Sequence, residues 1–177
     1  MYADDLLGHR RQKDQFFKTS PHSPLTQEQQ DAFQGLPYFP PDESYLLTVD
    51  AERLDGGAIA IETTRGEVRQ YRRYARFTVN APDADGEHMP IALTIYETQH
   101  GFFLPFTDSA DGVYSGGRYL EPDLIDETPD RARFSVDFNM AYSPFCAFSD
   151  GWSCPIVPGE NRLSVPIRAG ERYLEAY

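Results

Sequence analysis

The sequence predicts an all-β fold, mainly antiparallel, arranged as a sandwich or barrel with one or two N-terminal helices. From Ser44 onward, apolar and polar residues alternate with a period of two, in short segments separated by glycine and proline turns. A helical spacing of apolar residues is confined to the first 35 residues. Regularly spaced short strands favour a sandwich or barrel over a βαβ fold.

Two helices are expected before the strands. The first covers residues 3–18, where Asp4 or Asp5 can cap the N-terminus and Pro21 prevents continuation. Its apolar edge consists of Leu6, Leu7, Phe16 and Phe17. The second runs from Thr26, a suitable N-cap, to Gln34, before the stop signal Gly35.

The β core is expected to span residues 44–177. Its longest strand covers residues 68–79, which contain no glycine or proline, and Asp85-Gly86 marks a hairpin after it. The other alternating apolar sets are Tyr45, Leu47 and Val49; Ile59 and Ile61; Met89, Ile91, Leu93 and Ile95; Phe134, Val136 and Phe138; and Leu163, Val165 and Ile167.

Length and composition indicate one folded domain over residues 1–177, with residues 1–35 as its helical segment. A chain of 177 residues can bury a sizeable core but is short for two independent cores. Hydrophobic residues make up 40% of the chain, which excludes a disordered acidic polypeptide. No secretory signal opens the chain and no apolar run is long enough to span a membrane, so a cytoplasmic protein without a membrane partner is expected.

The net charge of -12 argues against nucleic acid as a partner, because binding to phosphates requires a basic face. Only Lys13 and Lys18 are lysines. An acid excess with so little lysine suggests a high-salt cytoplasm, where screening removes self-repulsion. An acidic protein from an ordinary GC-rich organism explains the composition equally well.

An arginine-rich strand reverses this acidic charge locally. Five of the 16 cations lie within twelve residues, at Arg65, Arg69, Arg72, Arg73 and Arg76. Alternation places Arg69 and Arg73 on one face and Arg72 and Arg76 on the other. Arg73, beside Tyr71, can bind an anionic ligand, whereas cross-strand pairing with carboxylates is the more common role of such arginines.

A glycine-rich segment over residues 105–123 is the second candidate region. Gly112, Gly116 and Gly117 permit a close backbone approach, which would hold Arg118 and Tyr119 over a pocket. The glycine spacing matches neither a P-loop nor a dinucleotide-binding motif. A structured β-turn loop is therefore the expected role of the glycines.

Residues 137–171 contain both cysteines, the single tryptophan and many polar groups. Strand phase puts Asp137 and Asn139 opposite the core triplet 134, 136 and 138, so they should face solvent or a cavity. Cys146 and Cys154 lack a CxxC arrangement, and the four histidines lie far upstream without ligand spacing. We therefore predict no metal site, and structural thiols are the common role for such cysteines.

Seven ordered motifs resemble the bacterial and archaeal family of the domain of unknown function 1684: KDQFF, SPL, PFTDSADG, GGRYLE, DFNMAYSPFCAF, CPIVPGENRL and IRAGE. The resemblance runs from Arg10 to about Glu171. It implies a mainly-β fold and implies no reaction. It places the family's polar motif positions on Arg118, Tyr119, Asp137, Asn139, Tyr142, Cys146, Cys154, Glu160, Asn161 and Glu171. Departures from the family pattern at Ser115 and Ser143 argue against essential roles for these two serines.

These observations lead to three hypotheses, of which the third, a metal or redox site based on Cys146 and Cys154, depends on the metal content and thiol titration of the purified protein. The first is a protein that binds an anionic small molecule, with catalysis left open and no cofactor predicted. The second is a protein-interaction or structural module in which the same residues form turn networks. The sequence contains no signal that specifies an oligomeric state. The candidate ligand-binding residues are Arg73, Arg118, Tyr119, Asp137, Asn139, Tyr142, Cys146, Cys154, Glu160 and Asn161.

Overall fold

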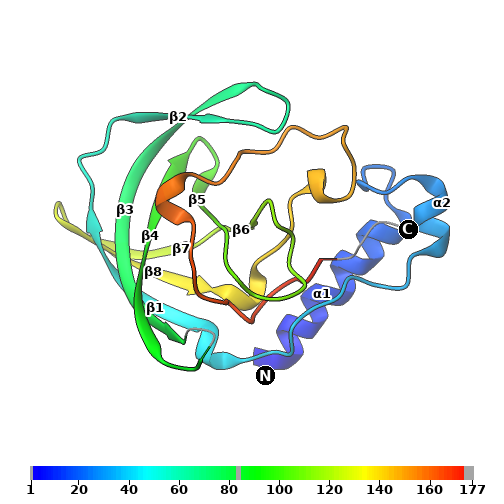
Figure 1. The fold of residues 1–177 in the computed structure, drawn as a ribbon, viewed down its shortest axis with the longest axis horizontal. Coiled ribbons are helices and arrows are strands. Elements are labelled where there is room, and N and C mark those ends of the chain that lie inside the picture. Colours follow the sequence, from blue (N-terminus) through cyan, green and yellow to red (C-terminus); the bar gives the residue numbers. More distant parts are fainter. Residues whose placement is uncertain (1, 83–84, 174–177) are drawn as a thin grey trace.

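The computed structural model describes residues 2–82 and 85–173, so residue 1 and residues 174–177 of the predicted domain lie outside the described chain. An antiparallel sheet curls into a half-barrel (Figure 1). The strand order is β6-β5-β4-β3-β1-β8-β7, with β2 paired to β3. The strands are β1 (Leu46–Arg53), β2 (Ala58–Glu62), β3 (Val68–Pro82), β4 (His88–Thr98), β5 (Gly101–Phe106), β6 (Arg118–Leu120), β7 (Asp123–Glu127) and β8 (Arg131–Asp137). The predicted all-β class with N-terminal helices is confirmed.

Two α-helices precede the sheet, α1 (Tyr2–Thr19) and α2 (Gln27–Ala32), as the sequence predicts. Thr26 caps α2 in a capping box: its Oγ1 accepts from Gln29 N at 3.2 Å, and Gln29 Oε1 accepts from Thr26 N at 2.8 Å. The short 3₁₀ helices are η1 (Glu43–Tyr45), η2 (Phe138–Met140), η3 (Phe145–Ala147) and η4 (Gly159–Asn161). None of the described helices is both long and apolar enough to cross a membrane.

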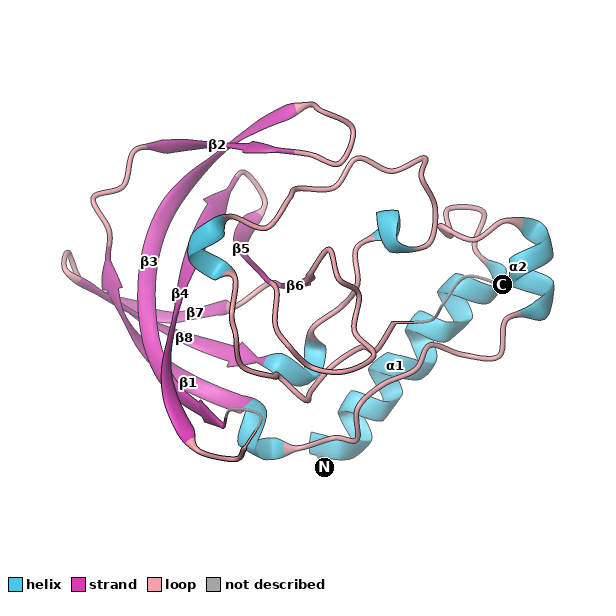
Figure 2. Cartoon of the chain, in the orientation of Figure 1, coloured by secondary structure: helices cyan, strands magenta, loops and turns pink. Residues whose placement is uncertain are grey.

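The hollow side of the half-barrel is covered by the C-terminal segment, residues 138–173, which is mostly irregular chain (Figures 1 and 2). Its Val165 and Ile167 pack into the main core with apolar residues from the strands. The core residues contributed by the sheet include Val49, Phe77, Leu93, Ile95, Leu104, Phe134 and Val136. Strand alternation selects this set, since each of these residues lies on the inner face.

The prediction of a final strand over residues 163–167 is wrong. These residues are all described and form no strand. Leu163 N donates to Thr107 O at 2.8 Å, and Ser109 N donates to Val165 O at 3.1 Å. Pro166 has no N–H for a ladder, and side chains bind much of the remaining backbone. Val165, Pro166 and Ile167 are all buried, so burial in this segment follows its packing against the sheet and does not alternate as in a strand.

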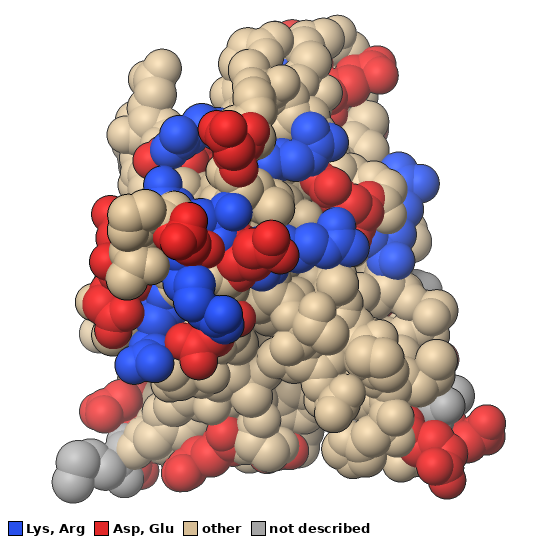
Figure 3. All heavy atoms as spheres, turned by 90° about the vertical axis from the view of Figure 1, so that its left-hand side faces the viewer, with Lys and Arg blue, Asp and Glu red and all other residues tan. Residues whose placement is uncertain are grey.

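The outer face of the sheet carries interspersed basic and acidic side chains (Figure 3). Arg72 Nε donates to Glu97 Oε2 at 2.6 Å across β3 and β4, and Arg133 Nε donates to Asp50 Oδ1 at 3.0 Å across β8 and β1. A bulge between Arg73 and Ala75 interrupts the simple alternation of the arginine strand. Arg72 and Arg73 of this strand are therefore each balanced by a carboxylate.

Candidate functional site

Arg118 on β6 is fully buried and binds the C-terminal segment. Its Nη2 donates to Asp108 Oδ2 and to Ile167 O, both at 2.8 Å, and its Nη1 donates to Glu171 O at 3.1 Å and to Ala169 O. The paired Asp108 is also almost completely buried. Three carbonyls and one carboxylate converge here without a neighbouring strand to donate hydrogen bonds to them. The guanidinium of Arg118 supplies these donors and the positive charge that pairs with the carboxylate.

Asn161 performs a similar task at the other end of the segment. Its Oδ1 accepts from Thr94 N at 2.8 Å, and its Nδ2 donates to Thr94 O and to Pro105 O, both at 2.8 Å. Asn161 has no exposed surface. The amide therefore replaces a strand partner between β4 and β5 and fixes η4 against the sheet.

Arg73 lies beside Glu160. Arg73 Nε donates to Glu160 Oε1 at 2.8 Å, and the Tyr96 hydroxyl donates to the same oxygen. Burial alone would raise the pKa of Glu160, but the hydrogen bonds from Tyr96 and Arg73 outweigh it and hold the pKa below its ordinary value. The carboxylate thus stays ionised and joins η4 to β3 and β4.

Asp137 and Asn139 form a third polar network. Asp137 Oδ2 accepts from the Tyr2 hydroxyl at 2.7 Å, and its Oδ1 accepts from Asn139 N at 3.0 Å. Asn139 Nδ2 donates to Asp42 O at 2.8 Å, and its Oδ1 accepts from Asp42 N at 3.0 Å. Strand β8 ends at Asp137, so the strand phase predicted for Asn139 is wrong and its side chain is buried.

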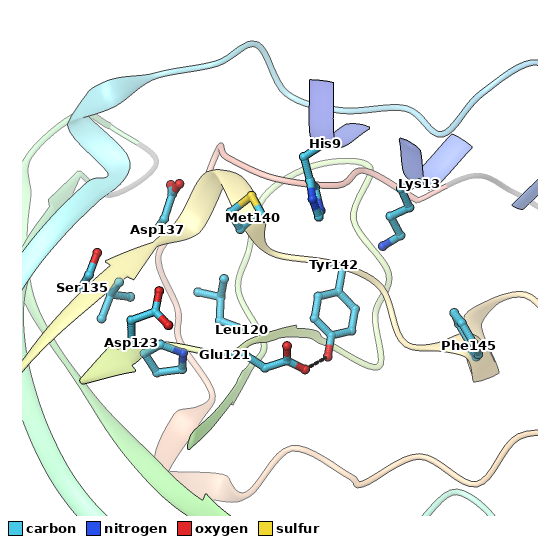
Figure 4. A pocket seen from close by; sticks show the side chains of 12 residues that line it. His9, Lys13, Leu120, Glu121, Asp123, Ser135, Asp137, Met140, Tyr142 and Phe145 are labelled. Atoms are coloured by element: carbon cyan, nitrogen blue, oxygen red, sulfur yellow. Dashed lines mark hydrogen bonds between the residues drawn. The ribbon is translucent and has the colours of Figure 1, made fainter. Parts of the chain in front are cut away.

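Two of the cavities among the described residues include predicted site residues in their lining. The helix-side cavity, about 370 Å³, lies between α1 and the β6–β7 and β8 ends of the sheet. Its lining consists of His9, Lys13, Leu120, Glu121, Pro122, Asp123, Ser135, Val136, Asp137, Met140, Tyr142 and Phe145. His9 and Lys13 extend from α1 toward Tyr142 (Figure 4). Lys13 Nζ binds the Glu171 carboxylate and lies 4.9 Å from the Tyr142 ring centre, so its charge is compensated within the protein.

The aromatic cavity, about 480 Å³, lies near the β4–β5 turn. Its lining consists of Arg69, Gln70, Tyr71, Thr98, Gln99, His100, Phe102, Phe103, Tyr119, Glu121, Tyr142 and Pro155. Successive rings contact one another. The ring centroids of Tyr71 and Phe103 are 5.7 Å apart in a stacked pair. Those of Phe103 and Tyr119 are 4.9 Å apart and those of Tyr119 and Tyr142 are 5.9 Å apart, both in edge-on pairs. These rings give the cavity a continuous aromatic wall.

Glu121 and Tyr142 line both cavities. The Tyr142 hydroxyl donates to Glu121 Oε1 at 2.9 Å (Figure 4). Burial, followed by the neighbouring Glu121 charge, raises the pKa of Tyr142, so the phenol remains a protonated donor. The pair is therefore a polar contact that the two cavities share.

The two cysteines are free and lie in one small cluster. Cys154 is buried and Cys146 is half-buried, and both pack with Tyr119, Tyr142 and Val157. Within the described residues, no group of three or more histidine, cysteine, aspartate or glutamate side chains is arranged to hold a metal ion.

The structure thus divides the predicted site residues. Tyr119 and Tyr142 line the aromatic cavity, and Asp137 and Tyr142 line the helix-side cavity. Within the described chain, neither lining includes the other predicted residues, which are Arg73, Arg118, Asn139, Cys146, Cys154, Glu160 and Asn161. Sequence reasoning missed Arg69, Phe103 and Glu121 as cavity residues. The arginine strand and the GGRYLE motif contained two of them, but only pairing in space separates the lining residues from their neighbours.

The comparisons with known proteins agree with the fold and supply no activity. Residues 31–172 match the family model described as Protein of unknown function (DUF1684). The solution NMR structure of an uncharacterized protein of Haloarcula marismortui is 35% identical, with a TM-score of 0.67 over 97% of this chain and 94% of that chain. A search of curated proteins finds no match. The chain therefore belongs to the DUF1684 family of proteins of unknown function.

Proposed function

We propose that this protein binds a small anionic molecule carrying a flat ring, in the aromatic cavity. The main support is that Arg69 lines this cavity and has no ion-pair partner among the described residues. Arg72, Arg73 and Arg118 each have a carboxylate partner, unlike Arg69. A guanidinium beside aromatic rings suits a carboxylate or phosphate attached to a ring.

The position of Arg69 supports an anchoring role. Its Nη2 donates to Ser153 O at 2.9 Å, which holds the side chain while leaving other guanidinium N–H groups without a charged partner. The residue is exposed, so a ligand can reach it. Tyr71 lies next to it in the same lining. Fixing the side chain in advance reduces the entropy lost when an anion binds.

The opposite part of the cavity suits hydrogen-bond donors of the ligand. Glu121 is an acceptor there, although one of its oxygens already accepts from Tyr142. Thr98, Gln99 and His100 add polar groups at the β4–β5 turn. A few placed polar groups around apolar walls are typical of small-molecule sites. The best matching class is therefore an anion with a ring and a hydroxyl or amino group, such as a nucleotide or a hydroxylated aromatic carboxylate.

A panel of nucleotides, sugar phosphates and aromatic carboxylates tests the proposal. Saturating ligand should raise the melting temperature, and titration calorimetry on the responding compound gives its Kd. Arg69→Ala should weaken binding by about tenfold or more, the loss expected for a charge-assisted contact. Tyr71→Ala should weaken it by removing the ring contact.

Arg65→Ala is the matched control. Arg65 is also exposed, and its Nη1 donates to Gly151 O at 3.0 Å in the same loop, but it does not belong to the cavity lining. The control removes the same charge from the same strand region, so it should keep the affinity within about twofold. Equal losses in both variants, or no response to any anion, would contradict the proposed site.

A second candidate function is a structural or protein-interaction module without a ligand. It is favoured by the burial of Arg118, Asn139 and Asn161, whose polar atoms bind mainly the chain's own backbone. In that case, alanine at Asn161 lowers stability while Arg69→Ala and Tyr71→Ala change no binding reaction. Asn161→Ala lowers stability under either function, so the ligand panel on wild type, Arg69→Ala and Tyr71→Ala separates the two functions.

We further propose that the acidic composition adapts the protein to a high-salt cytoplasm. The 35% identical protein of Haloarcula marismortui, a halophilic archaeon, supports this environment for the fold. The net charge of -12 predicts stronger self-repulsion at low ionic strength. The free energy of unfolding should therefore rise with KCl concentration, and a protein equally stable in dilute buffer would contradict the adaptation.

A further inference from the structure

Cys146 and Cys154 are two neighbouring thiols for which the cavities and networks above give no role. Cys146 lies in η3, and Cys154 follows an irregular loop that runs through Gly151 and Trp152. Both sulfurs belong to the cluster formed with Tyr119 and Val157. Because both cysteines pack in the same cluster, they form a pair and differ from an isolated buried cysteine.

The two thiols differ in environment. The neighbouring Cys146 side chain is the largest cause that lowers the pKa of Cys154, and the Arg69 charge lowers it further. The Cys154 side chain, followed by burial, raises the pKa of Cys146. Cys154 therefore has the greater thiolate character, and Cys146 is held beside it as the protonated partner.

The backbone is held by hydrogen bonds at both cysteines. Cys154 is held against the turn after β2, where its N–H donates to Thr64 Oγ1 at 3.2 Å and Thr64 N donates to its carbonyl at 2.9 Å. Ala147 N donates to Pro144 O at 2.9 Å and fixes η3. The loop between them, residues 148–153, contains no helix or strand, and a disulfide would bring the two sulfurs to about 2 Å.

We propose that Cys146 and Cys154 form a redox-active pair that closes to an intramolecular disulfide when a peroxide oxidises it. The Cys154 thiolate attacks one peroxide oxygen, the O–O bond breaks, and a sulfenic acid forms; the hydroxide that leaves takes up the proton that Cys154 released on ionisation and becomes the first water. The Cys146 sulfur then attacks the Cys154 sulfur, the S–O bond breaks, and water leaves with the Cys146 proton. Two thiols are oxidised, one hydrogen peroxide is reduced, and two waters form in total.

This inference is independent of the proposed ligand, but it affects the same neighbourhood. Trp152 lies between the two cysteines in sequence and packs edge-on against Phe145 at 4.9 Å. Phe145 contacts Phe17 of α1 at 6.0 Å and lines the helix-side cavity. Closing the disulfide constrains this loop, so the single tryptophan of the chain reports on the reaction.

The test uses the full-length protein, fully reduced and then treated with hydrogen peroxide. Titration of free thiols after unfolding should fall from two to none. The intact mass should decrease by two hydrogen atoms, and a digest should yield one peptide pair joined through Cys146 and Cys154. Tryptophan fluorescence should change with the same time course, and dithiothreitol should reverse all three signals.

The serine variants assign the two roles. Cys146→Ser keeps Cys154, which should form a sulfenic acid with peroxide that dimedone traps. Cys154→Ser keeps only Cys146, which should react with iodoacetamide about tenfold more slowly than the thiol of Cys146→Ser. The proposal is overturned if the folded wild-type protein keeps both thiols, or gains oxygen atoms without a cross-link. These wild-type outcomes decide the matter even if a serine variant does not fold.

Discussion

Two arginines show how the anchored interior differs from the aromatic cavity. Arg118 has no exposed surface, pairs with Asp108 and binds three backbone carbonyls of the C-terminal segment. Arg69 is exposed, donates to one carbonyl and has no ion-pair partner among the described residues. An arginine side chain thus fixes the fold at position 118, whereas at position 69 it remains available to an anionic ligand. Its partners and its burial decide the role.

The largest expected effect is the loss of Arg118. Arg118→Met keeps much of the apolar stem but leaves Asp108 buried and three carbonyls without a donor. The free energy of unfolding should fall by about 3–5 kcal/mol, because a buried charge loses its partner. Urea unfolding measures the difference. Arg131→Met, at an exposed position, is the control and should change stability by less than about 0.5 kcal/mol; equal effects in the two variants would refute the anchoring role.

Asn161→Ala should be the next most damaging change. It removes three hydrogen bonds and leaves the N–H and C=O of Thr94 and the carbonyl of Pro105 unsatisfied in the interior. We expect a loss of about 2–4 kcal/mol in chemical denaturation. The exposed Asn80 on β3 provides the control, since Asn80→Ala removes the same amide without burying orphaned groups. A loss under about 1 kcal/mol at position 161 would show that the sheet edge does not need the amide.

Glu160 provides a smaller, pH-dependent contribution. Its pKa is lower in the folded protein, so its stabilising effect is fully present above its ordinary value of 4.5 and disappears as the pH falls through the lower folded value. After allowance for solvent screening, the contribution should be below about 1 kcal/mol. Unfolding free energies measured from pH 6 to about pH 3 for wild type and Glu160→Gln test this. The wild type should lose more stability over the acidic range, and parallel curves would contradict the ion pair with Arg73.

The outer-face ion pairs should contribute least. Arg72 and Glu97 are linked across β3 and β4, but their side chains are 50% and 37% exposed to solvent. Arg72→Ala should change the free energy of unfolding by about 0.5 kcal/mol or less, and added salt should reduce even that difference. A double-mutant cycle with Glu97→Ala isolates the pair. A coupling above about 1 kcal/mol would place Arg72 among the anchoring residues instead of the surface ones.

Local sequence signals predicted the elements that depend on neighbouring residues. The capping box at Thr26, the break at Pro21 and the alternation in β1, β4 and β8 all act within a few residues. Strand β5 (Gly101–Phe106) was missed because its apolar run has no alternation, and β6 is only three residues long. The alternation over residues 163–167 was misleading, because packing against a curved sheet buries apolar residues here without strand pairing.

The sequence alone determined the all-β class, the two helices, the acidic charge and the region rich in polar motif residues. Composition and short-range periodicity are sufficient for these properties. Only the tertiary structure decided which polar side chains are occupied by hydrogen bonds to the protein's own backbone. Arg118 meets carbonyls 49 to 53 residues away, and Asn161 meets Thr94 across 67 residues. Such pairings depend on how the half-barrel closes over its C-terminal segment, and that closure leaves Arg69 beside the aromatic cavity without an ion-pair partner among the described residues.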